Sequence, residues 1–221
     1  MSHSTQALKQ RWNDRLPLLK AIRDRRSALK WVQQGCPLPA PHLVKKTTVA
    51  HYARLFHCRL FVETGTYYGE MVGFVRDKFD RIYTIEIDAT LHQQAVKRFA
   101  ASKHIVPLHG DSADVLPRIL PELKLPCLFW LDGHSDSKVT TRADKITPIT
   151  EELENIFASD LREYVILIDD ARYFGKLPDY PTLEAVESQI KRFDKPLVMT
   201  VHNDIVRIHP PKEKNPIYLK A

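Results

Sequence analysis

Paired cysteines, long apolar runs and glycine are all scarce in this 221-residue sequence. Its three cysteines, Cys36, Cys58 and Cys127, are far apart and form no CxxC pair, which argues against a disulfide framework and a zinc site. A reducing compartment fits this cysteine usage. The apolar runs are far shorter than the roughly 20 residues of a membrane span, and the first twelve residues lack the apolar segment of a secretory signal. We therefore expect a soluble, cytoplasmic protein without a membrane partner.

Composition and charge limit the classes of function. With 43% hydrophobic residues, the chain can form one domain with a sizeable core. The net charge of +6 permits an anionic partner but does not require one. Much of the basic excess lies before Val49. Nucleic-acid binding through residues 9–30, which Trp12 and Trp31 flank, is less favoured than packing of this segment on the domain or on a second copy, because its predicted helix carries an apolar stripe.

Strands and helices alternate from residue 48 onward. The expected strands are nearly continuous in apolar residues, which is typical of a parallel sheet covered by helices on both faces. A terminal hairpin around His202 completes the pattern. We predict an α/β fold with a doubly wound, mostly parallel, seven-stranded sheet. The expected parallel strands are Arg59–Glu63, Arg81–Glu86, Ile105–Leu108, Pro126–Asp132 and Tyr164–Asp169.

The chain divides into two parts by this pattern. Residues 1–47 are predicted to be an N-terminal helical extension, and residues 48–221 the main domain. The extension contains a predicted helix over 17–34, for which Pro17 suits the first turn. Residues 36–46, CPLPAPHLVKK, contain three prolines and are predicted to be an extended connector, followed by a short helix over 48–57.

The segment FVETGTYYGEMV, residues 61–72, is predicted to turn from the first strand into a helix through a glycine loop. It lacks the GxxxxGK[ST] of a phosphate-binding loop, and Tyr67 stands where a dinucleotide-binding GxGxxG loop has its second glycine. S-adenosylmethionine, which has no phosphate, suits this loop better. Glu63 can face its ammonium group, backbone N–H groups of the next helix can bind its carboxylate, and a tyrosine face attracts its sulfonium.

The loop ETGTYYG, residues 63–69, resembles the E-x-G-x-Y-x-G loop of class I S-adenosylmethionine-dependent methyltransferases. It is most similar to the metal-dependent catechol and caffeoyl-CoA O-methyltransferases, and the resemblance runs from about Phe61 to Tyr173. It implies a Rossmann-like methyltransferase fold, methyltransferase activity and the cofactor S-adenosyl-L-methionine. The loop residues that it implies as cofactor contacts are Glu63, Gly65, Thr66, Tyr67 and Gly69.

The same resemblance assigns polar residues after the second and third strands. An acid that ends the second strand can accept hydrogen bonds from both ribose hydroxyls; Glu86 is favoured over Asp88. After the third strand, Asp111 can accept from the adenine amine and Ser112 can bond to a ring nitrogen. Capping of the next helix is a structural alternative for both.

Acids also follow the fourth and fifth strands, at Asp132 and at Asp169-Asp170. The resemblance implies that these three bind Mg²⁺ or a similar divalent cation, with Asp132 serving in cofactor binding and catalysis as well. Mg²⁺ prefers carboxylate oxygens, and three converging carboxylates repel one another without a cation. In the structural alternative, Asp170 caps a turn and Asp132 orders its loop.

The general base differs from the resembled enzymes, which have a lysine shortly after the fourth-strand acid. Here the order is Asp132-Gly133-His134-Ser135, with Lys138 further on. We assign the base to His134, whose ordinary pKa lies near neutral pH. Fixing the loop or adding a metal ligand are equal alternatives for it. The polar segment 135–148 is expected to cover the substrate or to be a solvated loop.

These features favour a metal-assisted O-methyltransferase for a small hydroxylated acceptor such as a sugar. A chelated acceptor hydroxyl has a lowered pKa, which makes it a better nucleophile. A metal-free N- or O-methyltransferase and a dinucleotide-dependent α/β oxidoreductase are the alternatives. A homodimer is compatible with the sequence.

Overall fold

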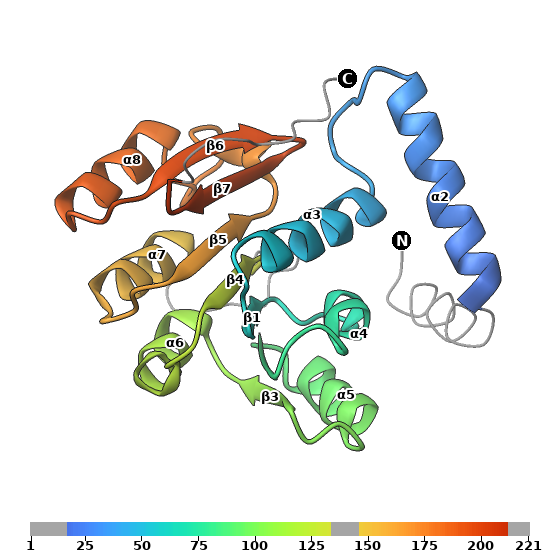
Figure 1. Cartoon of the computed structure of the whole chain (residues 1–221), viewed down its shortest axis with the longest axis horizontal. Coiled ribbons are helices and arrows are strands. Elements are labelled where there is room, and N and C mark those ends of the chain that lie inside the picture. The colour runs from blue at the N-terminus through green and yellow to red at the C-terminus, as the bar shows by residue number, and fades with distance from the viewer. Residues whose placement is uncertain (1–16, 134–145, 212–221) are drawn as a thin grey trace.

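A computed structural model describes residues 17–133 and 146–211 of the chain (Figure 1). Seven strands form one sheet in the order β3-β2-β1-β4-β5-β7-β6. Strands β1 to β5 are parallel, and β7 runs antiparallel to its neighbours β5 and β6. This confirms the predicted doubly wound, mostly parallel sheet. The strands are β1 Leu60–Thr64, β2 Arg81–Glu86, β3 Ile105–His109, β4 Cys127–Leu131, β5 Tyr164–Ile168, β6 Val198–His202 and β7 Ile205–His209.

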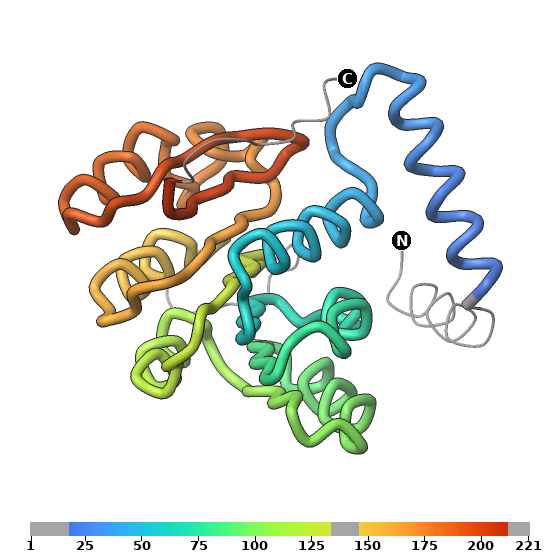
Figure 2. Tube along the Cα trace, viewed as in Figure 1, coloured from blue at the N-terminus to red at the C-terminus, as the bar shows by residue number. Residues whose placement is uncertain are grey.

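Helices cover both faces of the sheet (Figure 2). Strand residues alternate between the two faces, so Leu60 and Val62 pack with α6, α7 and α8, whereas Phe61 packs with α3, α4 and α5. Two apolar layers therefore bury the middle of the parallel strands β1, β2, β4 and β5, whereas the middle of the edge strand β3 is half-buried. The helices are α2 Pro17–Gln33, α3 His42–Leu55, α4 Glu70–Val75, α5 Ala89–Phe99, α6 Ser112–Ile119, α7 Ile149–Ala158 and α8 Leu183–Arg192, with 3-10 turns η1 Leu120–Glu122 and η3 Ala171–Tyr173.

Helix α3 begins six residues earlier than the sequence predicts. The expected connector over 36–46 is wrong for its last five residues, which are helical, and the division at residue 47 falls inside α3. Pro41 is the N-cap, and its carbonyl accepts hydrogen bonds from the backbone N–H of Val44 and Lys45 at 2.9 and 3.2 Å. A proline that is favourable before a first helical turn thus starts the helix where an extended segment is predicted. This places Lys45 and Lys46 on a helix.

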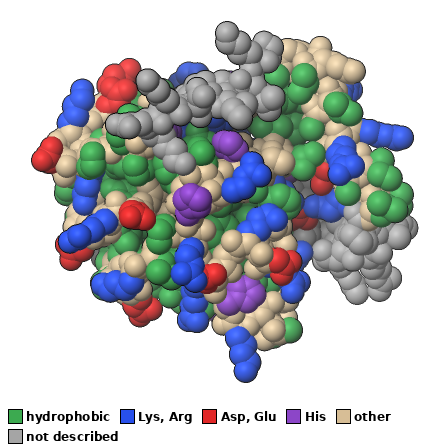
Figure 3. All heavy atoms as spheres, viewed as in Figure 1, with side chains coloured by type: hydrophobic (Ala, Val, Ile, Leu, Met, Phe, Trp, Pro, Cys, Tyr) green, Lys and Arg blue, Asp and Glu red, His purple; other side chains and the backbone are tan. Residues whose placement is uncertain are grey.

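Helix α2 contacts the domain through polar residues. Lys20 forms an ion pair with Glu70 at the start of α4, and Trp31 is buried, with its indole N–H donating to the Pro37 carbonyl at 2.6 Å. The apolar stripe faces outward instead: Leu18, Leu29 and Val32 are 72%, 64% and 55% exposed. Figure 3 shows hydrophobic and basic side chains together along the right edge, where α2 lies. Within residues 17–133 and 146–211, this stripe does not pack on the domain, although such packing is one of the two arrangements that we expect from the sequence.

Among residues 17–133 and 146–211, no helix combines the length and apolar character needed to cross a bilayer.

Candidate active site

Strand register gathers the predicted polar residues at one edge of the sheet. Thr64 pairs with Ile85 on one side and with Leu131 on the other, and Leu131 pairs with Ile168. The carboxyl ends of β2, β1, β4 and β5 are therefore level. The strand order reverses between β1 and β4, which is where open α/β sheets bind ligands. Glu63, Glu86, Asp132 and Asp169 each lie within one residue of such an end.

The loop between β1 and α4 depends on two glycines with positive φ. Gly65 has φ +81°, and a Cβ added there would overlap the backbone carbonyl oxygen of Asp132 and lie 2.9 Å from its carbon. Gly69, the N-cap of α4, has φ +69°, and its added Cβ would lie 2.8 Å from the Phe99 ring. Glycine alone fits both conditions, because L side chains avoid these φ values and no room is left for them. The loop therefore lies directly against Asp132, which follows β4, and against Phe99 of α5.

Three buried side chains form a hydrogen-bonded chain behind this loop. Thr84 Oγ1 donates to Glu63 Oε2 at 2.6 Å, so Thr66 Oγ1, which lies 2.6 Å from Thr84 Oγ1, donates to Thr84. Burial raises the pKa of Glu63 well above its ordinary value, and the Asp132 and Glu86 carboxylates add to this, against the opposing Thr84 hydrogen bond. A cationic ligand group beside Glu63 would favour its charged form.

Glu86 is buried at the end of β2 and holds the loop by hydrogen bonds. Its Oε2 accepts from the backbone N–H of Tyr67 at 2.7 Å, and its Oε1 accepts from that of Asp88 at 3.0 Å. The alternative acid, Asp88, is already used as the N-cap of α5, where its Oδ1 accepts from Thr90 and Leu91. Both oxygens of Glu86 and one oxygen of Asp88 thus accept backbone hydrogen bonds, and the preference for Glu86 as the ribose ligand stays a prediction.

The two tyrosines of the loop lie against each other, with ring centroids 4.2 Å apart. Tyr67 has φ +48° and is 42% exposed, whereas Tyr68 is half-buried, and its carbonyl accepts from Arg98 at 2.6 Å. Tyr67 is therefore the ring that is more accessible to a ligand.

Asp111 and Ser112 begin α6. Asp111 is its N-cap and accepts from the backbone N–H of Ala113 at 3.0 Å, which is the structural alternative raised from the sequence. The Ser112 hydroxyl donates to Glu152 of α7 at 2.5 Å. Its one hydroxyl hydrogen is thus directed at Glu152, and an adenine contact through Ser112 requires another atom of that residue or a rotation of the hydroxyl. Contacts of either residue with adenine stay predictions.

Glu152 gives the stability of the protein a pH dependence. Burial raises the pKa of its carboxyl from 4.5 to about 7, against the opposing hydrogen bond from Ser112. Its contribution to stability is complete below pH 4.5 and is lost as the pH rises through about 7. Through this group the wild type should lose up to about 3 kcal/mol of stability between pH 5 and 8. Glu152→Gln has no carboxyl to ionise, so its stability should not fall in this way over the same range. Urea denaturation across this range measures the difference. Glu154→Gln, an exposed change on the same helix, is the control, and equal pH profiles for both variants would contradict the prediction.

Three carboxylates converge where β4 and β5 end. Asp132, Asp169 and Asp170 each present an oxygen within 4.8 Å of the others, and Asp169 and Asp170 are each only 3% exposed. The backbone N–H of Asp132 donates to Thr64 at 3.2 Å, and that of Asp169 donates to Leu131 at 3.0 Å. This oxygen-only set suits a hard divalent cation such as Mg²⁺.

Lys45, which sequence reasoning missed, reaches this acidic cluster from α3. Its Nζ is hydrogen-bonded to Asp169 Oδ2 and lies 3.6 Å from Asp170 Oδ1. Burial acts to lower the pKa of Lys45, but the carboxylates of Asp169, Asp132 and Asp170 together outweigh it, and the net shift is upward. Burial also raises the pKa of Asp169, with Asp132 adding to the shift and Lys45 opposing it. Lys45 is thus a positive charge already present at carboxylates for which the sequence predicts a metal.

A second cation, Arg172, lies two residues after Asp170 and pairs with it. Its Nη1 donates to Asp170 Oδ1 at 2.7 Å and also to Asp204 in the β6–β7 turn. Asp170 has φ +59° and is the N-cap of η3, so it has the turn-forming role considered from the sequence as well. The pair links the acidic cluster to the terminal hairpin.

Several predicted site residues lie outside the described residues. They are His134, the assigned general base, and residues 135–145 of the polar segment that is expected to cover the substrate. The assignment of His134 as base therefore stays a prediction.

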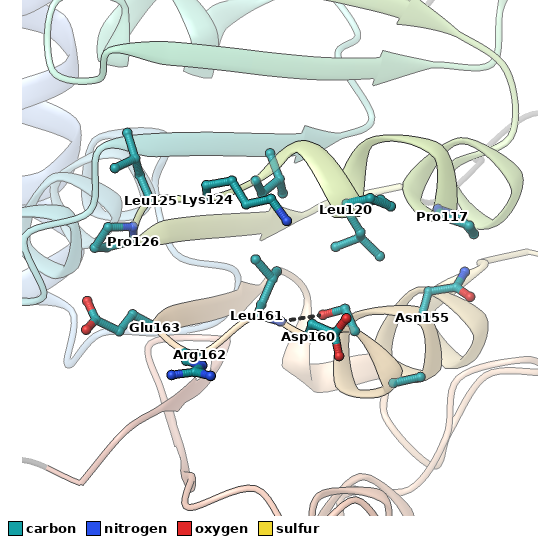
Figure 4. A pocket seen from close by; sticks show the side chains of 14 residues that line it. Pro117, Leu120, Lys124, Leu125, Pro126, Asn155, Asp160, Leu161, Arg162 and Glu163 are labelled. Atoms are coloured by element: carbon teal, nitrogen blue, oxygen red, sulfur yellow. Dashed lines mark hydrogen bonds between the residues drawn. The ribbon is translucent and has the colours of Figure 1, made fainter.

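A separate cavity of about 670 Å³ lies at the amino ends of β4 and β5, between α6 and α7 (Figure 4). Leu120, Leu125 and Leu161 line it, with Lys124 and Asp160 at its sides. This cavity lies at the amino ends of the strands, whereas the acidic cluster lies at their carboxyl ends, so the cavity has no part in the site above.

Comparison with known proteins supports the fold. No protein-family model matches the sequence, and a search of curated proteins finds no match either. Solved structures do match. The Streptomyces achromogenes O-methyltransferase TomG, in complex with S-adenosylmethionine, aligns over 83% of this chain and 86% of its own, with 18% identity and a TM-score of 0.52. The chain has the class I methyltransferase fold.

Two further structures agree. A Bacillus cereus O-methyltransferase in complex with S-adenosylhomocysteine aligns over 91% of this chain and 96% of its own, with 16% identity and a TM-score of 0.53. A Staphylococcus aureus protein described as a caffeoyl-CoA O-methyltransferase aligns over 94% and 98%, with 11% identity and a TM-score of 0.54. The resemblance drawn from residues 63–69 thus extends to the methyltransferase fold over most of the chain.

Proposed function

We propose that this protein is an S-adenosylmethionine-dependent methyltransferase that methylates an oxygen of a small hydroxylated acceptor. The observation that carries the proposal is the glycine loop at the topological switch point, with Glu63 behind it and Glu86 bonded to it. Glu63 would face the ammonium of the cofactor, Glu86 its ribose hydroxyls and Tyr67 its sulfonium. Helix α4 begins at Glu70, directly after its N-cap Gly69, and its first N–H groups would bind the cofactor carboxylate.

The acceptor would lie beside the acidic cluster. In-line methyl transfer requires the acceptor oxygen to be aligned with the methyl group and to lose its proton. Asp132, Asp169 and Asp170 would hold a divalent cation. When bound, such a cation would lower the pKa of a hydroxyl group coordinated to it. The metal-free alternative keeps specific support, because Lys45 and Arg172 already place two positive charges at these acids.

Binding of the product, S-adenosylhomocysteine, tests the proposal directly. Isothermal titration calorimetry should show one site in the micromolar range or tighter, and NAD should not compete for it. NAD binding without S-adenosylhomocysteine binding would instead favour the oxidoreductase alternative, which the absence of GxGxxG already disfavours.

The role of His134 has its own test. If His134 is the general base, His134→Ala should lower turnover by roughly a hundredfold with little change in the affinity for S-adenosylhomocysteine. The measurement is initial rate against acceptor concentration, once an acceptor is found by screening small hydroxylated compounds. Unchanged turnover would remove His134 from this role.

A further inference from the structure

Two consecutive lysines of α3 make different contacts. Lys45 is 14% exposed at its side chain and bonds to Asp169 in the acidic cluster. Lys46 points to α4 instead, where its Nζ donates to Glu70 at 2.9 Å. Glu70 also pairs with Lys20 of α2. One lysine thus fixes helices to one another, whereas the other supplies charge to the predicted metal ligands.

The ammonium group of Lys45 and a divalent cation cannot both occupy the cluster in this arrangement. The three carboxylate oxygens lie within 4.8 Å of one another, so a cation coordinated by all three would sit within a few ångströms of Nζ. At such distances like charges repel strongly when they are shielded from water, and Asp169 and Asp170 are both buried. Each lone pair that Lys45 uses on Asp169 is also lost to a metal.

We propose that Lys45 is a resident counter-ion of the acidic cluster, which competes with the divalent metal for Asp169 and leaves when the metal binds. This inference rests on the metal site of the proposed function and goes beyond it, because it makes metal occupancy depend on the position of one side chain of α3. Without metal, Lys45 lowers the repulsion among the carboxylates, so the folded protein does not need the metal for its stability.

The anchoring of α3 allows this exchange without loss of the fold. Val49, Tyr52 and Ala53 bury one side of the helix in the core, and Lys46 fixes its first turn to Glu70. The Lys45 side chain has four rotatable bonds beyond Cα, so its ammonium can move away while the backbone stays in place. Its movement would open the cluster towards an acceptor.

Titration of Mn²⁺ followed by electron paramagnetic resonance tests this competition. Lys45→Met removes the charge, so it should bind Mn²⁺ at least about tenfold more tightly than the wild type. Lys45→Arg keeps the charge and should stay within about threefold of the wild type. Lys46→Met, one residue along, removes a lysine that does not contact the cluster and should leave the affinity unchanged.

Thermal denaturation gives a second readout. Without metal, Lys45→Met should melt below the wild type, because the buried carboxylates lose their partner, and Mn²⁺ should restore its melting temperature. Lys45→Gln, which keeps a hydrogen-bond donor for Asp169, serves if the methionine variant does not fold.

Three outcomes would overturn the inference. They are equal or weaker Mn²⁺ binding by the neutral Lys45 variants, a matching gain in Lys46→Met, and no Mn²⁺ binding by any form. Titration of S-adenosylhomocysteine into the same proteins keeps the two proposals apart. Normal binding of it with unchanged Mn²⁺ affinity would contradict the role of Lys45 and leave the methyltransferase proposal in place.

Discussion

Gly65→Ala is expected to abolish binding of S-adenosylhomocysteine and to destabilise the fold by roughly 3 kcal/mol or more. The added Cβ would overlap the carbonyl group of Asp132, which is backbone and has no other rotamer to adopt. Either the loop after β1 or the chain after β4 must then move. Both lie at the proposed cofactor site, so calorimetry with S-adenosylhomocysteine and chemical denaturation should register the change together.

Gly35→Ala is the matched control for this effect. Gly35 has φ +80°, nearly the same as Gly65, but no heavy atom lies within 4 Å of its added Cβ. Alanine there should cost only the strain of a positive φ, about 1 kcal/mol, and leave ligand affinity unchanged. Similar losses at both glycines would mean that backbone strain, and not the close approach of β4, explains the requirement for Gly65.

Glu86→Ala is expected to weaken binding of S-adenosylhomocysteine on the order of a thousandfold. Two hydrogen bonds from ribose hydroxyls to a carboxylate would be lost, each contributing about 2 kcal/mol. The backbone N–H of Tyr67 would also lose its acceptor, which loosens the loop. Calorimetry at several ligand concentrations measures the affinity, and a circular dichroism melt confirms that the variant is folded.

Asp88→Ala separates the two acids that the sequence left as candidates. Asp88 caps α5, so its loss should lower stability by about 1 kcal/mol and leave the affinity for S-adenosylhomocysteine unaltered. A large loss of affinity in Asp88→Ala with a small one in Glu86→Ala would reverse the assignment of the ribose ligand.

Much of the fold can be predicted from local patterns. Buried parallel strands such as Val62 and its neighbours are apolar on both faces, and this makes them visible as short runs. The order of these runs and helices is enough to predict the doubly wound sheet. The loop over residues 63–69 is also visible, because its glycines and its acid are close together in sequence.

The N-terminal segment is predicted less well. Three prolines in residues 36–46 indicate an extended chain, yet α3 starts directly after Pro41. Proline disfavours the helix interior but is acceptable just before or within the first turn, so the same residue type is compatible with both conformations. The apolar stripe of α2 is another case: its period predicts the helix but does not say which face contacts the domain.

The sequence by itself determined the strands and helices and their order, the glycine loop, and the acid at each strand end, since each of these patterns lies within a short stretch of the chain. Only the tertiary structure decided that Asp132, Asp169 and Asp170 meet around the ammonium group of Lys45. Lys45 and Asp169 are 124 residues apart, and no local pattern relates them. Buried carboxylates take their partner from whichever chain segment the fold brings near, because Coulomb attraction depends on distance in space and not along the sequence.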